Sequence, residues 1–170
     1  MKKSIILIVF LAITWSLSSQ SIKKYNIANT GCYAYMFCDP GTFSLEKSPD
    51  SSEVYTAQCN MDSVEYDIIV VKLNSGIEDL NAAEDVVIAY MNHLKSVFNV
   101  NKSAGYGKGS RLNNDEKTRG ILDYWEDTTG NQIKIKGWTN GKLIAVLAVS
   151  SKADINENKA NLFLDGIRFP

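Results

Sequence analysis

The stretch that decides the fold is QIKIKGWTNGKLIAVLAVSS, residues 132–151. Two strand-like runs flank Asn140 and Gly141, and an Asn-Gly pair favours a type I′ turn because both of its central residues need positive φ. The second run, LIAVLAV, has the length of a strand and is too short to cross a membrane. Neighbouring strands joined by a tight turn pair antiparallel. The stretch therefore predicts an antiparallel hairpin.

Further strands are predicted on both sides of this hairpin. Residues 121–127 (ILDYWED) precede it across the turn TTGN, and residues 33–37, 42–48 and 53–59 form earlier strands. Pairing Leu45 with Tyr55 places apolar side chains of the second and third of these strands on one face. Residues 64–73 are apolar at consecutive central positions, which is typical of a central strand covered on both faces.

Two helices complete the expected fold. Residues 77–99 carry apolar side chains at spacings of three and four, the pattern of an amphipathic helix. Asp154, with Glu157 three residues later, predicts a capping box at the start of a short C-terminal helix. The predicted class is α+β, with a mainly antiparallel sheet of about six strands and one long and one short helix packed on it.

This layout resembles the PsbP/Mog1/DcrB-like fold. The resemblance rests on the FSLE strand at 43–46, a mid-chain helix of this length, the late strand GKLIAVLAVSS and the closing ANLFLDGIRF at 160–169. Members of that group are largely non-catalytic accessory or binding proteins. The resemblance therefore implies a binding or assembly role, and it carries over no functional residue.

The N-terminus predicts export. Two lysines, an apolar run from Ile5 to Trp15 and small residues at its end are typical of a signal peptide over residues 1–19, which leaves residues 20–170 as a single α+β domain. The chain has a net charge of −1 at pH 7, which does not favour nucleic acid as a partner. We expect a periplasmic or extracellular monomer with no transmembrane segment after cleavage.

The three cysteines predict one disulfide. Cys32 and Cys38 lie on one expected strand, roughly 20 Å apart when extended, whereas a disulfide holds the two Cα atoms about 6 Å apart. The Leu45–Tyr55 register brings Cys59 beside the turn that follows Cys38. The prediction is a Cys38–Cys59 disulfide with Cys32 unpaired. Cys32 is then either a buried apolar side chain, which the apolar residues after it favour, or the point of an intermolecular bridge.

Catalytic and cofactor motifs are weak throughout. The glycine-rich SAGYGKGSR, residues 103–111, follows a helix instead of opening one, so it is unsuited to hold a phosphate. We expect a flexible connection with one short edge strand there. His93 is the only histidine, and a zinc site that joins it to the three cysteines lacks a close cysteine pair. Asp123 and Asp127 would lie about 13 Å apart along a strand, too far for a glycosidase pair. We predict no catalytic residues, cofactor or metal.

One group of residues remains as a candidate ligand site. If Tyr124 faces Ile135, one sheet face carries Asp123, Trp125, Lys134, Lys136 and Trp138. Tryptophans and charged groups on one face can stack on a ring and fix it by charge. The alternative is that a helix covers the tryptophans and that the lysines reach around it to water.

The predicted function is therefore that of an exported, non-catalytic binding or accessory protein of the cell envelope. Its partner would be a protein or an envelope polymer. The alternative is a small secreted hydrolase without a recognisable motif.

Overall fold

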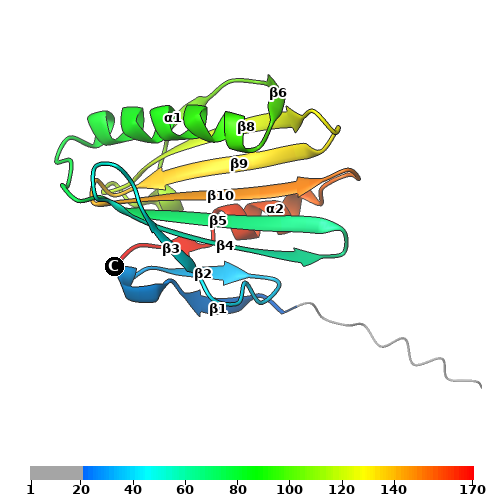
Figure 1. The fold of residues 1–170 in the computed structure, drawn as a ribbon, viewed down its shortest axis with the longest axis horizontal. Coiled ribbons are helices and arrows are strands. Elements are labelled where there is room, and N and C mark those ends of the chain that lie inside the picture. Colours follow the sequence, from blue (N-terminus) through cyan, green and yellow to red (C-terminus); the bar gives the residue numbers. More distant parts are fainter. Residues whose placement is uncertain (1–20) are drawn as a thin grey trace, which may run out of the picture.

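The computed structural model describes residues 21–170, so the predicted signal peptide lies outside the described residues. Within residues 21–170 the strands are β1 Lys23–Asn26, β2 Tyr33–Met36, β3 Ser44–Lys47, β4 Glu53–Met61, β5 Val64–Lys72, β6 Val100–Ser103, β7 Gly107–Ser110, β8 Arg119–Asp127, β9 Gln132–Thr139, β10 Leu143–Ser151 and β11 Ile167–Arg168. The α-helices are α1 Leu80–Val97 and α2 Glu157–Leu164, and the short 3-10 turns are η1 Ala28–Thr30 and η2 Leu112–Asn114. Figure 1 shows this arrangement.

The strands form two antiparallel sheets. The main sheet has eight strands in the order β3-β4-β5-β10-β9-β8-β6, with β7 also paired to β8. β1, β2 and β11 form a separate three-stranded sheet. The α+β class is confirmed, but the predicted number of about six strands is too low. The polar, glycine-containing residues 100–110 show no strand-like alternation, yet they supply β6 and β7 by pairing with β8.

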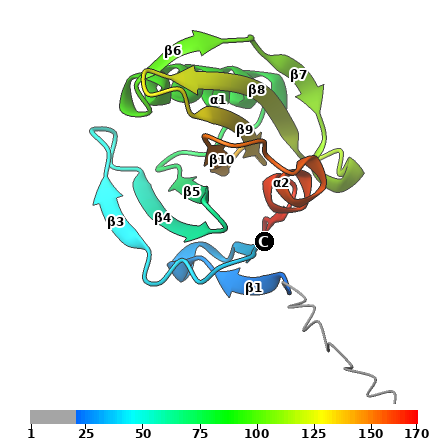
Figure 2. The same cartoon turned by 90° about the vertical axis from the view of Figure 1, so that its right-hand side faces the viewer.

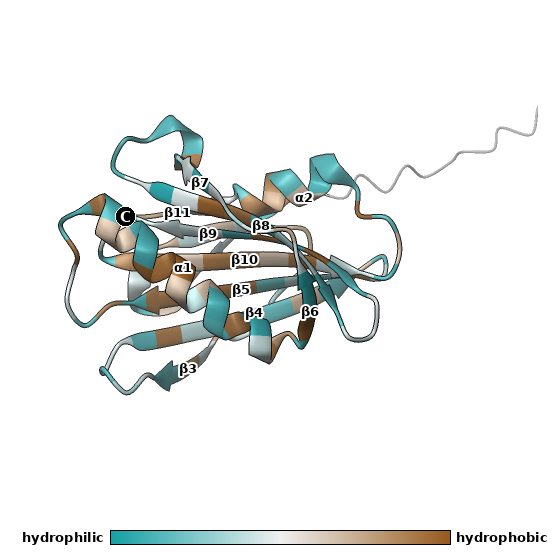
Figure 3. Ribbon diagram, turned by 90° about the horizontal axis from the view of Figure 1, so that it is seen from above, coloured by the Kyte–Doolittle hydropathy of each residue, from teal (hydrophilic) through white to brown (hydrophobic). Residues whose placement is uncertain are grey.

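The main sheet separates two apolar cores. α1 covers one face, where Val87 and Met91 pack over Ile135. α2 and the three-stranded sheet cover the other face, where Phe163 and Ile167 lie in the second core (Figures 1 and 2). β10 runs through the middle and contributes to both cores, which explains why it is apolar along most of its length in Figure 3. None of the helices in this described part combines the length and apolar character needed to cross a membrane.

Both helices begin at polar capping residues. The Asp79 carboxylate accepts a hydrogen bond from the Asn81 amide at 2.9 Å and caps α1, which lies inside the predicted range 77–99. The predicted Asp154 cap of the second helix is wrong. Asn156 caps α2 by accepting from the Lys159 amide at 3.0 Å. Ile155 packs against the core, so the helix begins only after it.

The pairing of β8 with β9 differs by one residue from the predicted register. The Asp127 amide donates to the Asn131 carbonyl at 3.1 Å, which leaves a three-residue loop in which Gly130 has φ 84°. A loop of three residues with glycine in the left-handed region is a common hairpin connection. The prediction treated all of TTGN as the loop. Tyr124 consequently lies opposite Lys134, and not opposite Ile135.

The hairpin at Asn140-Gly141 forms, but without the predicted type I′ turn. Only Gly141 has positive φ, at 82°, and Thr139 lies opposite Ile144. The Asn140 side chain accepts hydrogen bonds from the Lys142 and Leu143 amides at 3.0 and 2.9 Å, which stabilises the longer loop. The predicted Leu45–Tyr55 register of the β3–β4 hairpin is confirmed.

Candidate functional site

The predicted ligand-binding face does not exist as one surface. Because the β8–β9 register is shifted by one residue, Asp123 and Trp125 face α1, whereas Lys134, Lys136 and Trp138 face α2. A shift of one residue moves every side chain of a strand to the opposite face. Ligand binding by any of these five residues stays a prediction.

Asp123 is fully buried and holds several elements together beneath α1. Its carboxylate accepts hydrogen bonds from the Trp125 indole at 2.6 Å and from the Ser103 hydroxyl at 2.9 Å. Lys95 in the last turn of α1 lies 3.6 Å away and balances the charge. These contacts give Asp123 a structural role that joins α1, β6 and β8.

The two lysines and Trp138 attach α2 to the sheet. Lys134 forms an ion pair with Glu157, and Lys136 donates to both carboxylate oxygens of Asp165 at 2.7 and 2.9 Å. The Trp138 indole donates to the Leu164 carbonyl at 2.8 Å. α2 covers Trp138, as the alternative interpretation expects, but Lys134 is buried beside Glu157 and does not reach around the helix to water.

The glycine-rich segment packs against α1. The Gly109 amide donates to the Glu84 carboxylate at 2.8 Å, and Lys108 lies 3.3 Å from Asp85. A carboxylate therefore occupies the position that an anion would need. The segment contributes the edge strand β7 and no phosphate site is built on it.

The cysteines follow the predicted pairing. Cys38 and Cys59 form a disulfide with their Cα atoms 5.9 Å apart, and Cys32 is free and buried. Burial raises the pKa of the Cys32 thiol, while a hydrogen bond with Thr30 acts in the opposite direction. His93 is exposed beside Tyr90. Within residues 21–170 no three His, Cys, Asp or Glu side chains gather around a possible metal position.

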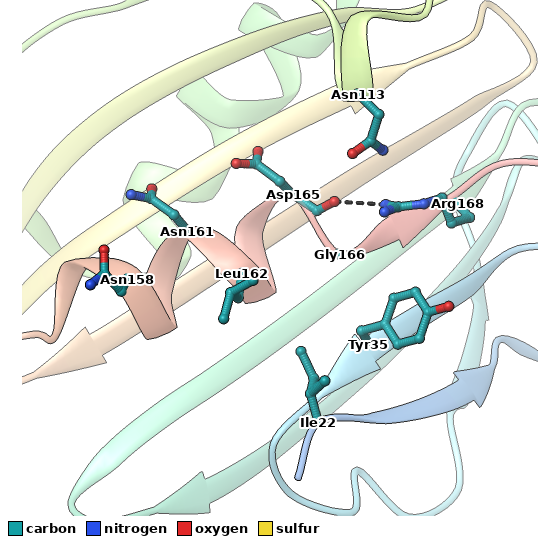
Figure 4. Close-up of a pocket in the computed structure, with 9 residues that line it drawn as sticks. All are labelled: Ile22, Tyr35, Asn113, Asn158, Asn161, Leu162, Asp165, Gly166 and Arg168. Atoms are coloured by element: carbon teal, nitrogen blue, oxygen red, sulfur yellow. Dashed lines mark hydrogen bonds between the residues drawn. The ribbon is translucent and has the colours of Figure 1, made fainter. Parts of the chain in front are cut away.

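A different pocket, which the sequence did not indicate, lies between α2 and the three-stranded sheet (Figure 4). Its volume is about 650 Å³. It is lined by Ile22, Tyr35, Asn113, Asn158, Asn161, Leu162, Asp165, Gly166 and Arg168. We refer to it as the Arg168 pocket.

Arg168 supplies a fixed positive charge. Its Nη1 donates to the carbonyls of Asp165 at 2.7 Å and Ile167 at 2.6 Å, and its Cζ lies 5.7 Å from the centre of the Tyr35 ring. The Asp165 carboxylate is turned toward Lys136 instead. Among the described residues, no carboxylate lies within 4.0 Å of the guanidinium. Because arginine stays ionised in proteins, this charge is available to an anion.

Amide groups line other parts of the same pocket. Asn158 and Asn161 are three residues apart on α2 and so share one face of the helix. Asn113 comes from η2 and lies on the same side of the pocket as Arg168 in Figure 4. Each amide both donates and accepts hydrogen bonds, which suits ligands rich in hydroxyl or amide groups.

An apolar surface completes the pocket. The Tyr35 ring, Ile22 and the exposed Leu162 present carbon atoms to the ligand space. The surface extends along β2, because the Tyr33 ring meets Tyr35 edge-on at 5.7 Å and Lys24 Nζ lies 3.8 Å above Tyr33. Aromatic faces beside cations are typical of surfaces that bind flat rings.

Gly166 makes this geometry possible. Its amide donates to the Phe163 carbonyl at 2.8 Å, and its carbonyl accepts from the Tyr35 amide at 3.1 Å. A β-carbon there would lie 2.8 Å from the carbonyl oxygens of Leu162 and Phe163. Only glycine lets the chain leave α2 so closely that Arg168 reaches Tyr35.

The pocket was missed because its residues are far apart in the sequence. Asn158 and Asn161 on the polar face of a short helix were a signal, as was Arg168 between the apolar Ile167 and Phe169. Neither signal indicates that β2 lies opposite.

The sequence matches no known protein-family model, and no curated protein matches it. Any inference about function therefore depends on the geometry of the pocket.

Proposed function

We propose that the protein is an exported, non-catalytic binding protein of the cell envelope and that the Arg168 pocket takes an acidic carbohydrate. The observation that carries the proposal is the guanidinium of Arg168. It lies over the Tyr35 ring without a carboxylate partner among the described residues, and three asparagines line the same pocket.

The three kinds of group in the pocket match the three parts of a uronic acid. Arg168 can donate two parallel hydrogen bonds to a carboxylate, which is the strongest pairing available to arginine. The amides of Asn113, Asn158 and Asn161 suit ring hydroxyls. Tyr35 and Leu162 offer an apolar surface to the face of the sugar ring. An envelope polymer is thus favoured over a partner protein.

Export and a monomeric state belong to the same proposal. The Cys38–Cys59 disulfide supports an oxidising compartment, because disulfides persist in secreted and periplasmic proteins. The predicted signal peptide at residues 1–19 agrees with that location. The layout that resembles the PsbP/Mog1/DcrB-like group, whose members are largely binding or accessory proteins, also agrees.

Titration calorimetry with two sugars tests the proposal. The probes are the acidic trimer of galacturonic acid and the neutral maltotriose. We expect the acidic trimer to bind at least tenfold more tightly, because a charge-assisted hydrogen bond contributes about 1.5 to 3 kcal/mol.

Variants locate the binding in the pocket. Arg168→Gln should remove most of the preference for the acidic trimer, and Tyr35→Ala should weaken both sugars. Arg111→Gln is the matched control, since Arg111 is an exposed arginine paired with Glu116 outside the pocket. Equal affinity for the two sugars, or an acidic preference that survives Arg168→Gln, would contradict the proposal.

A further inference from the structure

A second hollow, of about 580 Å³, lies on the α1 face of the main sheet. Its floor is formed by β4 and β5, and it is bounded by β3 on one side and by the C-terminal end of α1 on the other. Figure 2 shows β3 and α1 on either side of this part of the sheet. We refer to it as the Asp67 groove. It is separate from the Arg168 pocket, which lies on the other face.

The floor of the groove carries two carboxyl groups in contact. Glu65 and Asp67 are two residues apart on β5, so both point to the same face. The two carboxyls lie close enough for Glu65 to act on the pKa of Asp67 through its charge and through a hydrogen bond. Burial, and then the neighbouring Glu65, raise the pKa of Asp67 to about 7.

One oxygen of this pair is left without a partner. Asp67 Oδ2 is buried, and no hydrogen-bond donor within residues 21–170 reaches it. A buried polar atom without a hydrogen bond costs about 1 to 3 kcal/mol of stability. The hydrogen-bonding capacity of this carboxyl is therefore not met within the described chain.

The surroundings leave the negative charge of the pair uncompensated. The neighbours of Asp67 across the sheet are neutral, Gln58 on β4 and Ala148 on β10. The only cation in the last turn of α1, Lys95, is engaged with Asp123. Glu46 on β3 lies on the same face beside Tyr90 and adds further negative charge. In the described chain no lysine, arginine or histidine nitrogen lies within 4.0 Å of Glu65 or Asp67.

The wall of the groove toward α1 is apolar, whereas Ser44 and Thr56 line the opposite side. Ile69 continues the floor, and Phe98 and the exposed Val97 form the side toward α1. An aliphatic chain would gain contact with these side chains, whereas a hydrated metal ion would gain nothing. The described residues also offer no third carboxylate, histidine or cysteine at this place to complete a metal site.

We propose that the Asp67 groove binds an ammonium group carried on an aliphatic chain. The ammonium lies against the carboxyls of Glu65 and Asp67, and a proton held by Asp67 is released to solvent. The chain of the ligand lies against Ile69, Val97 and Phe98. This chemistry is that of a free diamine or of a lysine side chain.

Calorimetry with pentylamine and 1-pentanol tests the charge requirement, because the two probes share the same carbon chain. We expect pentylamine to bind and 1-pentanol to bind at least tenfold more weakly. Affinity for pentylamine should rise about tenfold between pH 6 and pH 8, because the competing proton is lost over that range. Cadaverine represents a free diamine, and Nα-acetyl-lysinamide represents a lysine side chain. Whichever of the two binds more tightly identifies the source of the ammonium group.

Variants decide whether Asp67 is responsible. Asp67→Asn should weaken pentylamine binding at least tenfold and remove its dependence on pH, and Glu65→Gln should weaken binding with the fold retained by NMR. Glu78→Gln, an exposed glutamate just before α1, is the matched control and should change nothing. Equal binding of 1-pentanol, pH-independent affinity, full affinity in Asp67→Asn, or displacement of pentylamine by micromolar Ca²⁺ would each overturn the proposal.

Discussion

Gly120 lies directly opposite Trp138 in the pairing of β8 with β9, and the indole ring occupies the space that a β-carbon at residue 120 would need. An ideal β-carbon there would stand 2.1 Å from two ring atoms. The ring is thereby held flat against β8 while its Nε1 reaches the last residue of α2, Leu164. This contact fixes the end of α2, from which the chain continues to Arg168.

Gly120→Ala should therefore destabilise the protein by about 1 to 3 kcal/mol, the usual cost of forcing an extra carbon into a filled core. The free energy of unfolding in urea measures it. Gly107→Ala on β7 is the matched control, because a β-carbon there would meet nothing closer than the Leu122 carbonyl at 3.9 Å. Equal stability of the two variants would mean that the Trp138 ring moves aside freely.

The ion pair of Lys134 with Glu157 gives an asymmetric prediction. The Lys134 side chain is only 5% exposed, whereas that of Glu157 is 64% exposed. Glu157→Gln leaves a buried ammonium without its partner and should cost on the order of 1 to 2 kcal/mol. Lys134→Met removes the charge and keeps the aliphatic stem, so its cost should stay below about 1 kcal/mol. Urea unfolding of both variants is the measurement, and the reverse order would show that the pair stabilises through its charge.

The elements that the sequence predicted well are those with strong local patterns. The spacing of apolar residues located α1, and the alternation around Leu45 and Tyr55 fixed the β3–β4 register and, through it, the Cys38–Cys59 disulfide. The edge strand β6 has no such pattern, because it is held mainly by pairing with β8.

The predicted ligand-binding face was wrong because the loop between β8 and β9 is one residue shorter than expected. The Asp127 carboxylate accepts hydrogen bonds from Thr129 and Asn131, and Gly130 then closes a loop of three residues instead of four. That difference separates Trp125 from Trp138. No local pattern in the strands themselves distinguishes the two loop lengths, and the pocket that replaces the predicted face joins segments as distant as Tyr35 and Arg168.

We expect the protein to lose stability when the Cys38–Cys59 disulfide is removed. Cys38 and Cys59 are separated by 21 residues, and closing a loop of that size contributes roughly 3 kcal/mol through the unfolded chain. A Cys38→Ala, Cys59→Ala double variant should lose about that amount in urea unfolding. Native protein should meanwhile show no reaction of Cys32 with iodoacetamide, because the thiol is buried and its pKa is raised. Rapid labelling of Cys32 in the folded protein would contradict its place in the core.

The last prediction concerns the pH dependence of stability and uses Asp67. Its pKa is about 7 in the folded protein against 3.8 for an ordinary aspartate. Between these values the folded state keeps a proton that the unfolded state has released, so stability falls as the pH rises from about 4 to 7. Asp67→Asn removes this loss.

The variant should consequently match the parent protein near pH 4 and exceed its stability at pH 8. The gain should be about 2 kcal/mol, less than the full pKa shift implies because part of the side chain is reached by water. Asp127→Asn is the control, since hydrogen bonds from Asn131 and Thr129 outweigh the effect of burial and hold the Asp127 pKa at about 2. The ionised Asp127 carboxylate ceases to stabilise the fold only as the pH falls below about 4. The difference in free energy of unfolding between Asp127→Asn and the parent should therefore stay constant from pH 4.5 to pH 8. If Asp67 keeps a proton on folding, the free energy of unfolding of the parent must fall with rising pH relative to that of Asp67→Asn. Parallel curves of the free energy of unfolding against pH for the two proteins would contradict this and show that Asp67 has an ordinary pKa.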